Sequence, residues 1–174
     1  MRGLVTFYLL FVIDLKTRKV HLAGVTTNPT GKYMNQIARN LTDCQDGFLK
    51  DHSFLLMDRD TKFTEQFRET LKTAEVKPIR LPPFSPNMNA YIERFFRSLK
   101  IECLNQMIFF SEKSLRFTVQ QYLEHYHKER NHQGLNNQLI DGPDVDAPSG
   151  NADTISIECR QRLGGMLKHY SRAA

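Results

Sequence analysis

The sequence predicts an α/β fold, and three observations support this prediction. Short apolar segments rich in β-branched and aromatic residues recur along the chain. Segments with apolar residues at helical spacing lie between and after them. The segments follow one another as strand, strand, helix, strand, helix, strand, helix, helix, which is typical of a sheet flanked by helices. We therefore expect a mixed sheet with helices packed against it.

The first part of the chain predicts a hairpin followed by a helix. Residues 4–13 are apolar and indicate a buried strand, and residues 19–26 alternate as a second strand does. The polar residues 14–18 connect them. Residues 30–42 are predicted to be helical because apolar side chains recur there at three- and four-residue intervals, at Met34, Ile37 and Leu41.

The middle of the chain predicts a strand, a helix and a strand. Residues 53–57 form a short buried strand that ends at Asp58, and residues 61–74 are predicted to be helical. Asp60 directly precedes this helix and is the better candidate for its amino-terminal cap. Residues 76–81 indicate a further strand, which Pro82 and Pro83 end.

Two helices are predicted next. Ser85 followed by Pro86 is a helix-start signal, so one helix is expected from residue 85 to about residue 107. Ser111 starts another, to about residue 130, with Glu112 as a possible cap in its first turn. Several large side chains in this region are expected in the core: Phe95, Phe96, Leu99, Phe109 and Phe110.

The carboxy-terminal part differs in composition. We expect one core domain over residues 1–140 and an acidic linker over residues 141–154, where proline and glycine are frequent. Residues 155–174 are expected to form a small tail, with a hairpin around Gly164 and Gly165.

Composition narrows the class of protein. The chain has 174 residues and a net charge of +5, so a polyanionic partner is compatible but not required. Its three cysteines favour neither a disulfide framework nor a cysteine zinc site, and they fit a reducing compartment. No apolar run approaches the length of about 20 residues that spans a bilayer. We expect a cytoplasmic protein without a membrane partner.

Two carboxylates stand out as candidate site residues. Asp58 follows a buried strand, where ligands gather in α/β proteins, although an aspartate there can also cap the following helix. Glu93 shares a helix face with Arg97 and Lys100, which is either a solvated ion-pairing face or one that holds a metal near phosphate groups. Arg94 adds positive charge nearby.

Three sequence blocks resemble one family in the same order. Asp58 and Glu93 are separated by 34 residues, which is similar to the D-(about 35)-E pattern of the retroviral-integrase and transposase superfamily. MDRDTKF resembles the family's strand-end block, and LPPFSPNMNAYIERFFRSLKIECL resembles its block around the final Glu. YLEHYHKERNHQGL resembles the downstream block, at Tyr126, Arg130, His132 and Leu135. Residues 4–140 thus resemble the integrase core of insertion-sequence transposases, which has an RNase H-like fold.

This resemblance implies DNA strand cleavage and joining by phosphoryl transfer with Mg²⁺ or Mn²⁺. Asp58 and Glu93 would be catalytic metal ligands, and the DNA-binding candidates are Lys62, Arg94, Arg97 and Lys100. The family uses a third carboxylate on its first strand. We expect that strand and its Asp to lie upstream of Met1, which would leave the chain catalytically incomplete; Asp14 as a relocated third ligand is the alternative.

Other interpretations remain open at this point. The chain could be a non-catalytic DNA-binding relic of a transposase, or an RNase H-like nuclease unrelated to transposition. If functional, it is expected to form a homo-oligomer. His125, His127 and His132 do not make a zinc site by their spacing, and we expect them to contact DNA phosphate or cap a helix.

Overall fold

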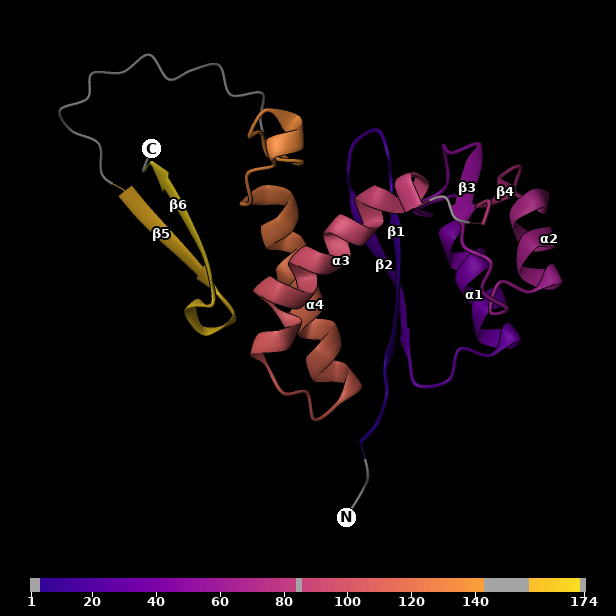
Figure 1. Ribbon diagram of the computed structural model, residues 1–174, viewed down its shortest axis with the longest axis horizontal. Coiled ribbons are helices and arrows are strands. Elements are labelled where there is room, and N and C mark those ends of the chain that lie inside the picture. The colour runs from indigo at the N-terminus through magenta and orange to yellow at the C-terminus, as the bar shows by residue number, and fades with distance from the viewer. Residues whose placement is uncertain (1–3, 84–85, 143–156, 173–174) are drawn as a thin grey trace. The chain divides into compact units, whose positions relative to one another are not determined.

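The computed structural model describes residues 4–83, 86–142 and 157–172, and the fold is mixed α/β (Figure 1). Most of the predicted linker lies outside these residues. The strands are β1 (Tyr8–Ile13), β2 (Val20–Thr26), β3 (Phe54–Met57), β4 (Lys77–Arg80), β5 (Ile157–Arg162) and β6 (Leu167–Arg172). The helices are α1 (Gly31–Leu41), α2 (Glu65–Thr73), α3 (Ala90–Glu102) and α4 (Glu112–Lys128).

The described strands form three two-stranded sheets. β1 pairs with β2, and their short connection makes this an antiparallel hairpin. β3 and β4 are parallel, with Phe54 opposite Lys77, because α2 forms the crossover between them. β5 and β6 form an antiparallel hairpin around residues 163–165, where Gly164 and Gly165 adopt φ of 68° and 90°. The predicted tail hairpin is confirmed.

The chain divides into two compact units. Unit 1 comprises residues 1–12 and 21–92, and unit 2 comprises residues 13–20 and 93–174. The predicted boundaries at residues 140 and 154 stay a prediction. No helix among the described residues combines the length and apolar character needed to cross a bilayer.

The core of unit 1 is apolar. α1 and α2 pack against each other and over β3 and β4, and their buried side chains form one cluster with strand residues: Met34, Ile37, Ala38, Leu41, Leu49, Met57, Phe67, Leu71 and Val76. Leu10 and Val12 of β1 pack against the same cluster. The predicted helical spacing therefore identified the buried face of α1.

Helix boundaries depend on capping residues. Thr30 caps α1 by accepting a hydrogen bond from the Tyr33 N–H, and Ser111 caps α4 in the same way through Ser114. The prediction that Asp60 caps α2 is wrong: α2 starts at Glu65, and the Thr64 hydroxyl accepts from the Phe67 N–H. The carboxylate of Asp60 instead binds Lys62.

α3 is shorter than predicted. A 3-10 turn at residues 86–89 precedes it, and it ends at Glu102 because Cys103 leaves the helical conformation with φ of −137°. Ser85, the predicted start signal, lies outside the described residues. Phe95 and Leu99 are buried as expected, whereas the prediction that Phe110 is in the core is wrong because its side chain is 91% exposed in the connection before α4.

Candidate functional site

Asp58 lies in unit 1 at the carboxyl end of β3. Met57, the last residue of the strand, is buried, and the next side chain emerges into solvent. One carboxylate oxygen of Asp58 accepts a hydrogen bond from the Asp60 N–H at 3.0 Å. This bond orients the carboxylate at the strand end without burying it, so Asp58 remains accessible to a ligand.

Lys62 lies in the loop that follows and is committed to Asp60. The Asp60 carboxylate accepts from the Lys62 N–H at 2.9 Å and forms an ion pair with its ammonium group. Hydrogen bonds from the Lys62 side chain and backbone lower the pKa of Asp60. The same ammonium group lies 5.9 Å from the Tyr8 ring centroid. Lys62 is half-buried here, and its contact with DNA stays a prediction.

Glu93 lies in unit 2 in the first turn of α3, where a negative charge is favoured by the helix dipole. Its side chain is exposed, and so are those of Arg94, Arg97 and Lys100. Phe95 and Leu99 occupy the buried face of the helix. The predicted face is therefore real: α3 presents Glu93, Arg97 and Lys100 to solvent on one side.

Asp14 belongs to the connection between β1 and β2 and lies in unit 2. Its carboxylate accepts from the Lys16 N–H at 2.8 Å and from the Thr17 hydroxyl. Its own N–H donates to the Lys19 carbonyl at 2.9 Å, which closes the hairpin. Arg18 has φ of 66°, so the turn is tight. Asp14 thus organises this turn, and its role as a metal ligand stays a prediction.

The predicted site residues are divided between the two units. Asp58 and Lys62 belong to unit 1, whereas Asp14, Glu93 and the three cations of α3 belong to unit 2. Their assembly into one site therefore stays a prediction. Within the described ranges, no group of three or more His, Cys, Asp or Glu side chains gathers as a metal site would require. Exposed carboxylates are nevertheless the donors that a hard divalent cation prefers.

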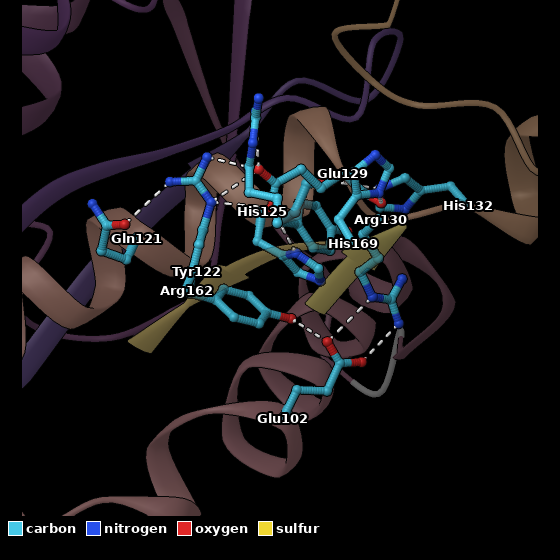
Figure 2. A network of polar contacts seen from close by, with 11 residues as sticks. Glu102, Gln121, Tyr122, His125, Glu129, Arg130, His132, Arg162 and His169 are labelled. Carbon is cyan, nitrogen blue, oxygen red and sulfur yellow. Dashed lines mark hydrogen bonds and ion pairs between the residues drawn. The ribbon is translucent and has the colours of Figure 1, made fainter. Parts of the chain in front are cut away.

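A polar cluster of unit 2 was not predicted as a site (Figure 2). Glu102, at the end of α3, binds Arg130 through both oxygens, with distances of 3.2 Å to Nε and 2.8 Å to Nη2. The hydroxyl of Tyr122 donates to the same carboxylate at 3.0 Å. Burial, together with the charge of Glu102, raises the pKa of Tyr122, so the hydroxyl keeps its proton. This cluster links the end of α3 to α4.

A second cluster surrounds Glu129, whose side chain is only 2% exposed. Arg162 of β5 binds it with three contacts of 2.7–3.0 Å, and His125 donates from Nδ1 at 3.1 Å. Burial alone would raise the pKa of Glu129, but these hydrogen bonds and charges outweigh it and lower the pKa to about 2. Nδ1 of His169 donates to the Glu129 carbonyl. The tail hairpin is therefore held on α4.

His127 of α4 and His132, which follows the helix, have hydrogen-bond partners within unit 2, and the expected contact of these histidines with DNA phosphate stays a prediction. Nε2 of His127 accepts from the Val20 N–H at 3.0 Å, and Nε2 of His132 donates to the Tyr126 carbonyl at 2.7 Å. Burial lowers the pKa of both. Sequence reasoning missed these roles because each partner is distant in the chain or on the backbone. Only the block containing Tyr126, Arg130 and His132 marked the region.

Comparison with known proteins finds one family that resembles part of the chain. Residues 74–139 match the family described as integrase core domain, a range that includes Glu93, Glu102 and Arg130. The comparison with curated protein sequences finds no match.

The fold is similar to that of a chain in the cryo-EM structure of the simian T-cell lymphotropic virus intasome in complex with the PP2A regulatory subunit B56 gamma. The TM-score is 0.56 and the identity is 12%, over 97% of this chain and 61% of that chain. This chain therefore spans about three fifths of its structural neighbour. Residues 74–139 thus match the integrase core domain family, and the chain has a mixed α/β fold that is similar to that of the intasome chain and consistent with an RNase H-like fold.

Proposed function

We propose that this chain is the core of a DNA transposase or integrase that cleaves and joins DNA strands by metal-dependent phosphoryl transfer. The observation that carries the proposal is the exposed face of α3. Glu93 lies within the residues that match the integrase core domain, and it shares this face with two cations. A carboxylate beside cations can approach a phosphate backbone that it would otherwise repel.

Asp58 and Glu93 are the residues that would hold the metal. Both are accessible carboxylates, and Asp58 has a fixed orientation through the Asp60 N–H. A bound Mg²⁺ or Mn²⁺ would activate the attacking oxygen and stabilise the leaving oxygen at phosphorus. Asp14, whose oxygens hold the Lys16 and Thr17 turn, is the alternative third ligand.

The cations of α3 would hold the DNA. Arg94, Arg97 and Lys100 are exposed on a single helix, so they can contact successive phosphates, with Lys62 as a further candidate. Each phosphate contact that is lost should reduce the salt dependence of binding by about one unit of slope. Arg97→Gln should therefore weaken DNA binding at low salt and lower this slope, while Lys113→Gln, at an exposed position on α4, serves as the control.

Metal-dependent cleavage of DNA by the full chain tests the proposal. With Asp14 as the third ligand, the wild type should nick or join a labelled duplex only when Mg²⁺ or Mn²⁺ is present. Asp58→Asn and Glu93→Gln should each reduce this activity to background with an unchanged melting temperature. Asp51→Asn and Glu124→Gln, which remove exposed carboxylates from the same two units, should retain it. Full activity in either site variant would overturn the assignment.

Binding without chemistry is the second candidate function. It is favoured because the Asp14 carboxylate accepts hydrogen bonds from Lys16 and Thr17 in its own turn. Asp58 and Glu93 are then the two candidate metal ligands that lie in sequence blocks resembling the family. In that case the wild type would bind DNA with a salt dependence set by the cations of α3 and would show no cleavage with either metal.

An RNase H-like nuclease would instead cleave the RNA strand of a hybrid duplex. A homo-oligomer, if formed, would appear in sedimentation with DNA.

A further inference from the structure

α3 packs against α4 through a stripe of buried side chains. Phe95 and Leu99 form the stripe, the buried Cys103 continues it just beyond the helix, and Phe95 packs on Tyr126 with ring centroids 5.1 Å apart. Aromatic contacts of this kind fix the distance between α3 and α4. Phe95 lies seven residues, or about two turns, before Glu102, so a contact at Glu102 adds a second restraint on the rotation of α3 near its carboxyl end.

Glu102 lies on the flank of this stripe and opposite Glu93. Nine residues separate the two positions, which is about two and a half turns of an α-helix, so their side chains leave the helix on opposite sides. The Glu102 carboxylate is bound by the Arg130 guanidinium and the Tyr122 hydroxyl. A two-pronged contact with Arg restricts orientation as well as distance.

The partners of Glu102 are themselves held in place. The Arg130 N–H donates to the His125 carbonyl at 2.9 Å, and its guanidinium lies 5.7 Å from the Tyr126 ring centroid. Tyr122 is fully buried. The residue before Arg130, Glu129, is bound to Arg162 of the tail hairpin. The anchor for Glu102 is therefore rigid, and the tail hairpin supports it.

We propose that Glu102, Arg130 and Tyr122 are positioning residues, which set the rotation of α3 and so the direction in which Glu93, Arg97 and Lys100 point. This inference rests on the proposed function, because it assigns a purpose to the direction of that face. The three residues do not contact substrate in this role. They act through the helix, whose rigidity carries a constraint at Glu102 to the opposite side at Glu93.

Spin-label distances within unit 2 measure this rotation without requiring activity. Cysteines are introduced at Lys100 on α3 and Gln120 on α4, both exposed, after the exposed Cys44 and Cys159 are changed to Ser. The buried Cys103 remains. The distance distribution is recorded for the otherwise unchanged chain and for Glu102→Gln, Arg130→Met and Arg130→Lys. Lys128→Gln removes an exposed ion pair of α4 and is the matched control.

The expected result is a shifted or broadened distance in Glu102→Gln and Arg130→Met. A rotation of about 30° moves a side chain at the helix surface by about 3 Å, which the method resolves. Arg130→Lys should give an intermediate distribution because it keeps the charge and loses the two-pronged contact. Lys128→Gln should match the reference. A lower melting temperature with an unchanged distance distribution would show a purely stabilising role and overturn the inference.

The DNA-cleavage assay separates the two ideas. Glu102→Gln should lower kcat at least tenfold, and the distance change should accompany it. If the wild type shows no metal-dependent cleavage, the proposed function fails, whatever the labels report. If the wild type cleaves DNA and Glu102→Gln neither moves α3 nor lowers kcat, the positioning role fails and the proposed function stands.

Discussion

The two units of this chain are stabilised in different ways. The core of unit 1 consists of aliphatic and aromatic side chains from α1, α2 and the strands, such as Leu71 and Phe67. Unit 2 buries polar groups within its core, including Glu129, His125 and His132. A hydrophobic core tolerates changes in pH, whereas buried ionisable groups connect stability to protonation. Buried contacts in unit 1 are mainly apolar, whereas unit 2 combines apolar packing with specific pairings of buried polar groups.

The largest effect is expected from Phe67→Ala in unit 1. Phe67 is 1% exposed and packs against Phe63 and the α1 cluster, so its removal leaves a cavity. The free energy of unfolding should fall by about 3–5 kcal/mol. Hydrogen exchange of α2 amides, measured by mass spectrometry, checks this. If apolar packing stabilises unit 1, the loss in free energy of unfolding should be the same at pH 4 and pH 7. A loss that changed with pH would contradict the difference between the two units.

Arg162→Met should cost about 3 kcal/mol in unit 2 at neutral pH, because it leaves the Glu129 carboxylate buried without its main partner. The pKa of Glu129 is lowered to about 2 from an ordinary 4.5, so the stabilisation is complete above pH 4.5 and is lost as the pH falls toward 2. Urea unfolding from pH 7 to pH 2.5 measures the difference between wild type and variant.

The control for this change is on the same strand. Arg160 lies 3.6 Å from the same carboxylate with its side chain 69% exposed, so Arg160→Met should cost at most about 1 kcal/mol. Equal losses for Arg160→Met and Arg162→Met would mean that Glu129 senses overall charge and has no specific partner.

His127 should give a smaller effect at a higher pH, and its stabilising form is again the unprotonated one. Nε2 must be unprotonated to accept from the Val20 N–H, and burial lowers the pKa of His127 from 6.5. The unfolded chain therefore binds a proton more readily, and stability is complete above pH 6.5 and falls below it. His127→Gln should lose about 1 kcal/mol at pH 7.5 and flatten the decline between pH 7 and pH 5. His21 and His132 shift in the same direction, so only the difference from wild type is diagnostic.

The smallest effect is expected at the surface of unit 1. Lys72 and Glu69 form an exposed ion pair on α2, so Lys72→Gln should change the free energy of unfolding by at most about 0.5 kcal/mol. The small loss expected for this variant on the same helix is the baseline against which the loss in Phe67→Ala is compared. A loss above 1 kcal/mol would show that surface charge, as well as packing, stabilises unit 1.

Local sequence patterns were enough to predict most elements of unit 1 and the charged face of α3. Apolar periodicity located α1 and its buried side, and the pattern around Glu93 placed three charged groups on one exposed face, because both depend on local spacing. The start of α2 was missed because residues 61–64 form a turn that Thr64, and not Asp60, converts into a helix. Asp and Thr stabilise the start of a helix by similar free energies when they cap it, so the burial of the neighbouring side chains decides which residue becomes the cap.

The polar core of unit 2 could be recognised only in the folded chain. Glu102 meets Arg130 across 28 residues and Glu129 meets Arg162 across 33, and each pair lies on different elements. Charged residues at such separations look like any solvated surface in a sequence, because pairing energy depends on distance and burial, which local spacing does not contain. Folding buries Glu129 against Arg162 and brings the partly exposed Glu102 and Arg130 into a two-pronged contact, and these pairings hold α3 and the tail hairpin in place.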